Sequence, residues 1–269
     1  MNMTVRTALS PLTLILTLAS ASAIAGPVDL SSWQIDGGGN WTLFNGTDSV
    51  NQSLNSRPTV FFNDMDSQGL ALSGSIRQGL QDGSPGGGDD DFFGFVLGYD
   101  AGDLFGTNPT TDYILLDWKQ FSQGGWDAGM SISRVTGSID ASGTDVSADA
   151  WDHVGNVSLI ERAATLGNTG WVDNQEYLFD ISFTATNIQV KVDGVLQFDI
   201  DGTFEDGSFG FYNFSQPQVN YAGIEEDILP PSCGDPGQPP CSVSVPEPAS
   251  TFLIGLGLVG LGWSRRRKA

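Results

Sequence analysis

The sequence has little positive charge. It contains 11 Lys and Arg against 32 Asp and Glu, a formal net charge of -21 at pH 7. Only 6 of the basic residues lie between the two chain ends, together with 31 acidic ones, a balance of -25. This balance argues against nucleic acid or an anionic membrane surface as a partner. Either divalent cations neutralise part of the repulsion, or the acids form a solvated surface that keeps the chain soluble.

Cysteine and histidine are also scarce. Cys233 and Cys241 bracket a loop rich in proline and glycine and do not form a Cys-x-x-Cys redox motif. We expect them to form a disulfide outside the cytoplasm. The lone histidine, His153, is far away in the sequence, so this pair is not expected to bind zinc. No Gly-x-Ser-x-Gly nucleophile elbow occurs that would make His153 part of a hydrolytic triad.

Neither end has an apolar run as long as the ~20 residues of a permanent membrane helix. Residues 1–25 nevertheless predict a secretory signal peptide. Arg6 supplies the charged start, Ala8–Ala19 is apolar, and Ala23-Ile24-Ala25 gives the small-x-small cleavage pattern. The mature protein is therefore expected to start near Gly26.

The C-terminal residues 245–269 predict a second targeting signal, a sorting signal. Pro246, Glu247 and Pro248 precede an apolar stretch, Thr251–Trp263, and a basic cluster follows. Prolines expose a cleavable peptide, the stretch forms a short transmembrane sorting helix, and the positive charges stay cytoplasmic. The basic cluster consists of Arg265, Arg266, Arg267 and Lys268.

This arrangement resembles the PEP-CTERM sorting signal of Gram-negative bacteria. The resemblance implies an exosortase-type processing protease as partner and a link to exopolysaccharide or biofilm. We expect export through the inner membrane and transient anchoring by the tail. The final place would be the cell surface or the extracellular matrix. A plain C-terminal membrane anchor is the alternative.

Between the ends, short β-type runs alternate with turn residues. Many antiparallel strands without helices predict an all-β, two-sheet sandwich over residues 26–228, followed by a linker at 229–244. Asp193-Gly194 predicts a type I′ hairpin, and Asn156–Thr165 is the only helix-like piece. The expected strands are Asp91–Tyr99, Tyr113–Gln120, Met130–Thr136, Glu176–Thr184, Asn187–Val192, Val195–Ile200, Ser208–Phe214 and Val219–Ile224.

Four segments, in order, resemble the thrombospondin C-terminal domain. They are the acidic turn and strand at 88–99, the strand ending Trp118-Lys119-Gln120, the turn at 167–171, and the strand at 207–216. The resemblance implies a concanavalin A-like jelly-roll sandwich that is lectin-like and binds calcium. The growth-factor-like modules and calcium repeats of animal thrombospondins have no counterpart here, so their receptor interactions are not carried over.

Acidic turns are the candidate calcium sites. Asp89, Asp90 and Asp91 follow three glycines, and adjacent carboxylates repel one another unless a cation joins them. Asp64 and Asp66 are expected to add oxygens from a neighbouring loop, although the rest of an EF-hand loop is missing. The alternative for each is a hydrated turn.

Most aromatic residues fit a strand core by their spacing: Phe92, Phe95, Trp118, Phe209 and Phe211. Trp126, next to Asp127 on a loop, is the weak candidate for stacking on a sugar, and packing at the rim is the alternative.

Sandwich glycosidases need paired carboxylates, often as Glu-x-Asp-x-x-Glu on one strand. Only Glu225-Glu226-Asp227 approaches this pattern, and Pro230 stands where the third acid belongs. The sequence therefore predicts a non-catalytic, calcium-binding, lectin-like module whose partner is an extracellular polysaccharide or a surface protein. A polysaccharide hydrolase or lyase on the same fold is the alternative. A structural surface protein that binds no sugar is a third possibility.

Overall fold

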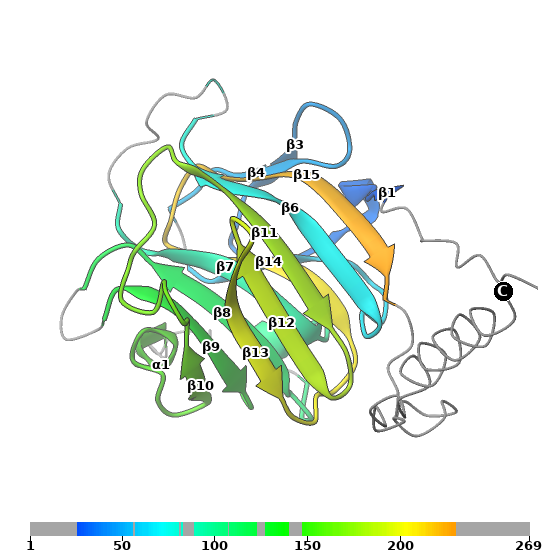
Figure 1. Ribbon diagram of the computed structural model, residues 1–269, viewed down its shortest axis with the longest axis vertical. Coiled ribbons are helices and arrows are strands. Elements are labelled where there is room, and N and C mark those ends of the chain that lie inside the picture. Colours follow the sequence, from blue (N-terminus) through cyan, green and yellow to red (C-terminus); the bar gives the residue numbers. More distant parts are fainter. Residues whose placement is uncertain are drawn as a thin grey trace, which may run out of the picture.

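Alternating apolar and polar residues along the chain produce two antiparallel β-sheets packed face to face (Figure 1). The computed structural model describes residues 26–55, 57–80, 82, 89–106, 108–122, 127–139 and 147–229. Each strand pair found in these residues is antiparallel. The expected all-β, two-sheet sandwich is therefore confirmed.

The first sheet, sheet A, has the order β13-β12-β11-β6-β15-β4-β3, and the short β1 also pairs with β15. Its strands are β1 (Gly26–Pro27), β3 (Trp41–Leu43), β4 (Val50–Gln52), β6 (Leu70–Gln78), β11 (Glu176–Phe183), β12 (Asn187–Val192), β13 (Val195–Asp201) and β15 (Val219–Ile228).

The second sheet, sheet B, has the order β10-β9-β8-β7-β14-β5-β2. Its strands are β2 (Gln34–Gly37), β5 (Thr59–Phe62), β7 (Phe92–Tyr99), β8 (Tyr113–Lys119), β9 (Gly129–Val135), β10 (Val157–Arg162) and β14 (Ser208–Phe214). In the described part of the chain, three short helical pieces join the strands: η1 (Leu30–Ser32), η2 (Asp103–Phe105) and α1 (Ser147–Asp152).

The strand boundaries largely follow the sequence pattern. β12 and β14 have the expected bounds, and β7 is buried along its whole length in the middle of sheet B. Asp193 and Gly194 have φ values of 49° and 74°, as a type I′ turn requires, so the predicted hairpin is confirmed. β15 runs four residues past the expected end, because a bulge between Ala222 and Glu225 lets the pairing with β6 continue.

The helix expected at Asn156–Thr165 is wrong. Val157–Arg162 is strand β10, which pairs with β9, and a helix lies just before it at Ser147–Asp152. The pairing of β10 with β9 shifts between Leu159 and Glu161. This bulge breaks the two-residue alternation that marks a strand, and the remaining apolar spacing imitates a helix.

Aromatic side chains fill the space between the sheets. The Phe211 and Tyr221 rings stack with centroids 4.2 Å apart, joining sheet B to sheet A. Phe95 packs on Phe179 across the same interface, with centroids 4.6 Å apart. Each aromatic pair of this kind adds about 0.5–1.5 kcal/mol beyond the burial of apolar area. The predicted core residues Phe95, Trp118, Phe209 and Phe211 all belong to this inter-sheet core.

The two outer faces differ. On sheet B, outward side chains such as Phe92 and Tyr212 form a second apolar cluster with Ala150 and Trp151 of α1. Figure 1 shows α1 beside β9 and β10. On sheet A, most outward side chains of the central strands are polar, and they are partly or fully exposed, as Asp180 at 53% illustrates. Among the described residues, sheet B is therefore covered on both sides, and sheet A keeps a free outer face.

Candidate functional site

The free outer face of sheet A, formed by β6, β11, β12, β13 and β15, is called the open face below. Strand register arranges its outward side chains in rows across the sheet. One row runs Glu225, Ser73, Asp180 and Lys191, from β15 through β6 and β11 to β12. Carboxylates, hydroxyls and an ammonium group thus stand side by side, where each can bond to a polar ligand.

A hollow of about 500 Å³ lies in the open face over β15, β6 and β11. The bulge in β15 shapes it: Gly223 has a φ of +60°, and a side chain added there would meet open space. Serine hydroxyls line the hollow, and exposed Leu178 gives it an apolar wall. Its polar lining includes Ser73, Ser75, Glu176 and Glu225.

One hydroxyl of this hollow already has polar partners. Ser75 Oγ lies 3.3 Å from Glu176 Oε2, to which it donates, and 3.5 Å from the carbonyl oxygen of Ala222. Both contacts are long for hydroxyl hydrogen bonds, whose usual length is about 2.7–2.8 Å. A ligand hydroxyl can therefore replace them at little cost. An apolar wall beside hydrogen-bonding groups can bind a sugar, because a sugar presents both C–H and O–H groups.

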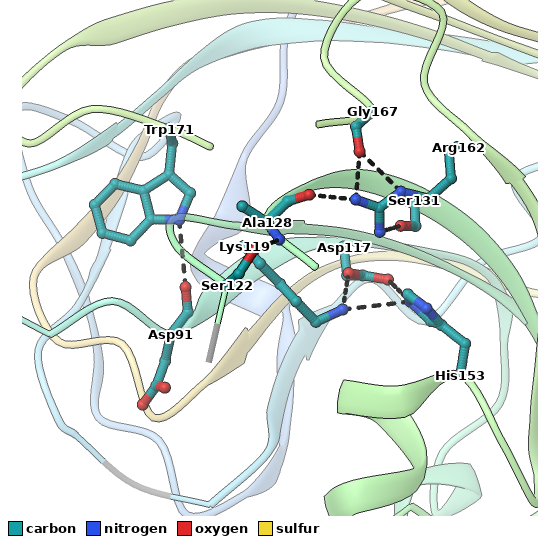
Figure 2. Close-up of polar contacts among 10 residues, drawn as sticks. All are labelled: Asp91, Asp117, Lys119, Ser122, Ala128, Ser131, His153, Arg162, Gly167 and Trp171. Carbon is teal, nitrogen blue, oxygen red and sulfur yellow. Dashed lines mark hydrogen bonds and ion pairs between the residues drawn. The ribbon is translucent and has the colours of Figure 1, made fainter. Parts of the chain in front are cut away.

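The covered face of sheet B holds a buried ion cluster, shown in Figure 2. Asp117 and Lys119 are fully buried on β8, and their oxygen and nitrogen are 2.6 Å apart. His153, just after α1, approaches Asp117 Oδ1 with Nε2 at 2.9 Å. The same nitrogen also lies 3.3 Å from Lys119 Nζ, so one ring nitrogen contacts both members of the ion pair.

Attraction between the opposite charges of this cluster offsets the cost of burying them. Burial by itself raises the pKa of Asp117, but Lys119 and His153 hold that pKa below its ordinary value. The Lys119 ammonium also lies over the Phe92 ring, 4.9 Å from its centroid. His153 has a φ of +52°, a left-handed conformation that is uncommon for a residue with a side chain. The cluster thus fixes the turn after α1 onto sheet B.

A second hollow, of about 300 Å³, lies beside this cluster. Asp127, Asp152, His153 and Leu159 are among the residues that line it, so the predicted ligand residue Asp127 borders a concave site. Arg162 also lines it, but its guanidinium donates to the carbonyl oxygens of Ala128 and Gly167 and to Ser131 Oγ (Figure 2). Arg162 therefore holds two loops together instead of offering free donors.

The acidic turn lies where β7 begins. Asp89 accepts hydrogen bonds from the Asn55 amide and from the backbone N–H of Asp90. Ser215 Oγ donates to Asn55 Oδ1 at 2.8 Å. Burial raises the pKa of Asp91 to about 6, and the neighbouring Asp89 and Asp90 charges add to this. The three carboxylates are half-buried and lie next to amide and hydroxyl oxygens.

Asp64 and Asp66 do not join the acidic turn. They follow β5, whose end at Phe62 pairs with Gly210 of β14. The acidic turn precedes Phe92, which pairs with Phe214 at the other end of β14. Both Asp64 and Asp66 are exposed, and Asp64 lines a different hollow, of about 520 Å³, near Trp33 and Glu226. The two acidic segments therefore lie at opposite ends of sheet B.

Several expectations fall outside the residues that the structure describes. They concern Trp126, Cys233, Cys241 and both terminal segments. Within the described ranges, no three histidine, cysteine, aspartate or glutamate side chains converge as a metal ion requires. No helix in those ranges is long and apolar enough to cross a membrane.

The sequence did not reveal the open face as a site. Its side chains come from five strands, and only strand register brings Glu225, Ser73 and Asp180 into one row. The exposed residues that alternate with buried ones along β11 and β12 were the signal that the sequence offered. The sequence could not show which of the two sheets would be covered by α1.

Residues 244–267 match the model of the PEP-CTERM protein-sorting motif. The match includes Pro246, Glu247, Pro248 and three residues of the basic cluster, Arg265, Arg266 and Arg267, so this resemblance is confirmed. Such a motif implies export and anchoring through the C-terminus. A search of curated proteins found no significant match.

Several solved structures are similar in fold. The carbohydrate-binding module CBM66 from Bacillus subtilis has 11% sequence identity and a TM-score of 0.50, covering 73% of this chain and 95% of that one. The exoplasmic/lumenal domain of VIP36, in a Ca²⁺/Man-bound form, has 13% identity and a TM-score of 0.47, covering 76% and 85%. Xenopus laevis galectin-Ib has 13% identity and a TM-score of 0.37, covering 62% and 98%. At these identities the likeness shows the fold alone, a lectin-like jelly-roll sandwich.

Proposed function

We propose that this chain is an exported, non-catalytic, lectin-like module that binds an extracellular polysaccharide on the open face of sheet A. Its place is the cell envelope or the exopolysaccharide matrix, which it reaches through the C-terminal sorting motif after processing by an exosortase-type protease. The domain spans residues 26–228. It lies between a signal peptide at 1–25 and a linker at 229–244 that carries the Cys233–Cys241 disulfide.

The observation that carries this proposal is the contrast between the two outer faces. α1 and an apolar cluster cover sheet B, whereas sheet A exposes rows of carboxylates, hydroxyls and amides around a hollow of about 500 Å³. A rigid, polar and concave surface suits a flexible, hydroxyl-rich chain. The fold shared with a carbohydrate-binding module supports the same proposal.

The proposal includes membership in the thrombospondin C-terminal domain family. The segments that resemble that family meet in space, which supports the assignment. Trp171 Nε1 donates to the Asp91 carbonyl oxygen, as Figure 2 shows, and Trp118 Nε1 donates to Thr169. The fourth segment, in β14, pairs directly with β7.

Calcium at the acidic turn is the second part of the proposal. Asp89, Asp90 and Asp91 offer carboxylate oxygens, and Asn55 and Ser215 lie close enough to add neutral oxygens. Calcium prefers such a mixed oxygen set. The three carboxylates do not converge in the described residues, and the Asn55 amide donates to Asp89, so binding requires the turn to draw its carboxylates together and Asn55 to turn its oxygen inward. The ion would neutralise the turn and fix the start of β7.

A glycan screen on the full chain, in a detergent without a sugar headgroup, tests the proposed binding. Ser75→Ile fills the hollow and removes its hydroxyl, and we expect the affinity for a bound glycan to fall at least about tenfold, or 1.4 kcal/mol. Ser158→Ile, on exposed edge strand β10 of sheet B, is the matched control and should leave affinity unchanged. No glycan bound by the wild type, or equal loss in both variants, would contradict the proposal.

A polysaccharide hydrolase or lyase is the second candidate, and the second hollow favours it. His153, backed by a buried carboxylate, lines that hollow beside Asp127 and Asp152. Incubating the chain with its bound polysaccharide and measuring chain length decides between the two. Cleavage that His153→Ala abolishes, in a variant that still folds, would establish an enzyme. Unchanged chain length supports the binding module.

A further inference from the structure

The open face is strongly acidic. Six carboxylates point outward from its strands, against two basic side chains. The acids are Glu176, Asp180, Asp199, Asp201, Glu225 and Asp227, and the bases are Arg77 and Lys191. A polysaccharide that lies on this face therefore meets a negative potential, which disfavours uronate, sulfate and phosphate groups.

The two bases are already engaged. Lys191 Nζ lies 3.7 Å from Asp180 Oδ2, and the Arg77 guanidinium donates to the carbonyl oxygen of Leu80. Neither neutralises Glu225, which stands exposed at the edge of the hollow beside Ser73. Glu176, on the other side, receives the long contact from Ser75 described above, the one hydrogen bond that the described residues give its carboxylate. Two carboxylates thus flank the hollow with accepting capacity to spare.

Their spacing indicates the size of the ligand. Glu225 and Glu176 lie on β15 and β11, the two neighbours of β6, and their partners on β6 are Ser73 and Arg77. Two strand spacings and four residues along a strand separate their Cα atoms by roughly 16 Å. One sugar ring cannot reach both carboxylates, whereas an oligosaccharide laid diagonally across the hollow can.

We propose that the open face binds a polysaccharide with free amino groups, whose ammonium groups pair with Glu176 and Glu225. This inference rests on the proposed function and names the ligand class of the same site. An ammonium group donates hydrogen bonds to a carboxylate in a charge-assisted contact, while the serines and Leu178 take the sugar hydroxyls and C–H faces. Because the carboxylates are exposed, salt should weaken the binding.

The test titrates the full chain with glucosamine hexasaccharide and with its N-acetylated form, which has the same length and no charge. We expect the free-amine hexamer to bind at least tenfold more tightly, and its disaccharide to lose most of that affinity. Glu176→Gln combined with Glu225→Gln should abolish the preference for the free amine. Thermal melts verify that this double variant folds.

A matched control separates the site from general attraction between an acidic protein and a cation. Glu161→Gln combined with Glu205→Gln removes the same two charges at exposed positions of β10 and the loop before β14. This control should keep the preference. Equal weakening in both double variants, or no preference for the free amine, would overturn the inference and leave carbohydrate binding intact. If no glycan of any class binds, the proposed function itself fails.

Discussion

Three ionisable side chains meet where the turn after α1 packs on sheet B: Asp117, Lys119 and His153. Each member has an ionic or hydrogen-bonding partner within the cluster, so its burial is compensated. The turn that carries His153 lies against sheet B, and this closes the outer face beside α1. The cluster therefore helps to keep the outer face of sheet B covered.

Asp117→Asn tests this role. The variant leaves Lys119 without a buried counter-charge, and breaking a buried pair costs about 3–5 kcal/mol. For a domain of this size we expect the melting temperature at pH 7 to fall by about 6–20 °C. Circular dichroism measures the shift. Asp152→Asn, an exposed neighbour, is the control and should melt within a few degrees of the wild type.

The same carboxyl predicts an acid dependence. The pKa of Asp117 is lower in the folded chain than its unfolded value of about 3.9. Its stabilisation is therefore complete above about pH 4 and is lost as the pH falls through the folded pKa. The melting temperatures of wild type and Asp117→Asn should approach each other as the pH falls below about 4. A constant difference between them from pH 7 to pH 2 would contradict this assignment.

At the scale of elements, strands β7 and β8 approach each other closely at Gly94. A Cβ atom at this position would lie 1.8 Å from the Leu116 carbonyl oxygen, which is backbone and cannot move aside. Gly94 also accepts a hydrogen bond from Tyr221 through its own carbonyl. The glycine that the sequence places inside a central strand therefore has a packing reason.

Gly94→Ala should destabilise the sandwich by about 3 kcal/mol, as overpacking of a tight core does. Chemical denaturation measures the free energy of unfolding directly. Gly223→Asn is the control, because a side chain there meets open space and asparagine tolerates a positive φ. Equal stability of Gly94→Ala and the wild type would mean that β7 and β8 separate more easily than the packing indicates.

The elements also show why prediction from sequence succeeded and failed. β12 and β14 have regular alternation and clear turns, and their bounds were predicted correctly. β10 was taken for a helix because a bulge at Leu159–Glu161 hides its alternation. The acidic turn could be predicted because its three aspartates are consecutive in the sequence. The open face and the His153 cluster could not be predicted, because their members are far apart in the sequence. The hydrogen bond from Ser75 to Glu176 spans 101 residues, and the contact between Asp117 and His153 spans 36.

At the scale of the molecule, the many carboxylates repel one another, and a bound calcium ion would reduce this repulsion. We therefore expect the stability of the folded chain to depend on calcium. Calcium at 100 times its dissociation constant would add about 2.7 kcal/mol to the folded state. We expect the melting temperature in millimolar calcium to exceed that in EDTA by about 5–10 °C. Asn at Asp89, Asp90 and Asp91 together should abolish the shift, whereas Asp64→Asn with Asp66→Asn should keep it. An unchanged wild-type melt would show that the turn is solvated surface.

The central claim is that a polysaccharide lies on the open face of sheet A. Carbodiimide labelling of exposed carboxylates, with and without a bound glycan, tests it most directly. The account predicts protection of Glu176 and Glu225, with labelling of Asp64, Asp127 and Asp152 unchanged. Protection of Asp127 and Asp152, with Glu176 and Glu225 still labelled, would place the ligand in the second hollow and contradict the account.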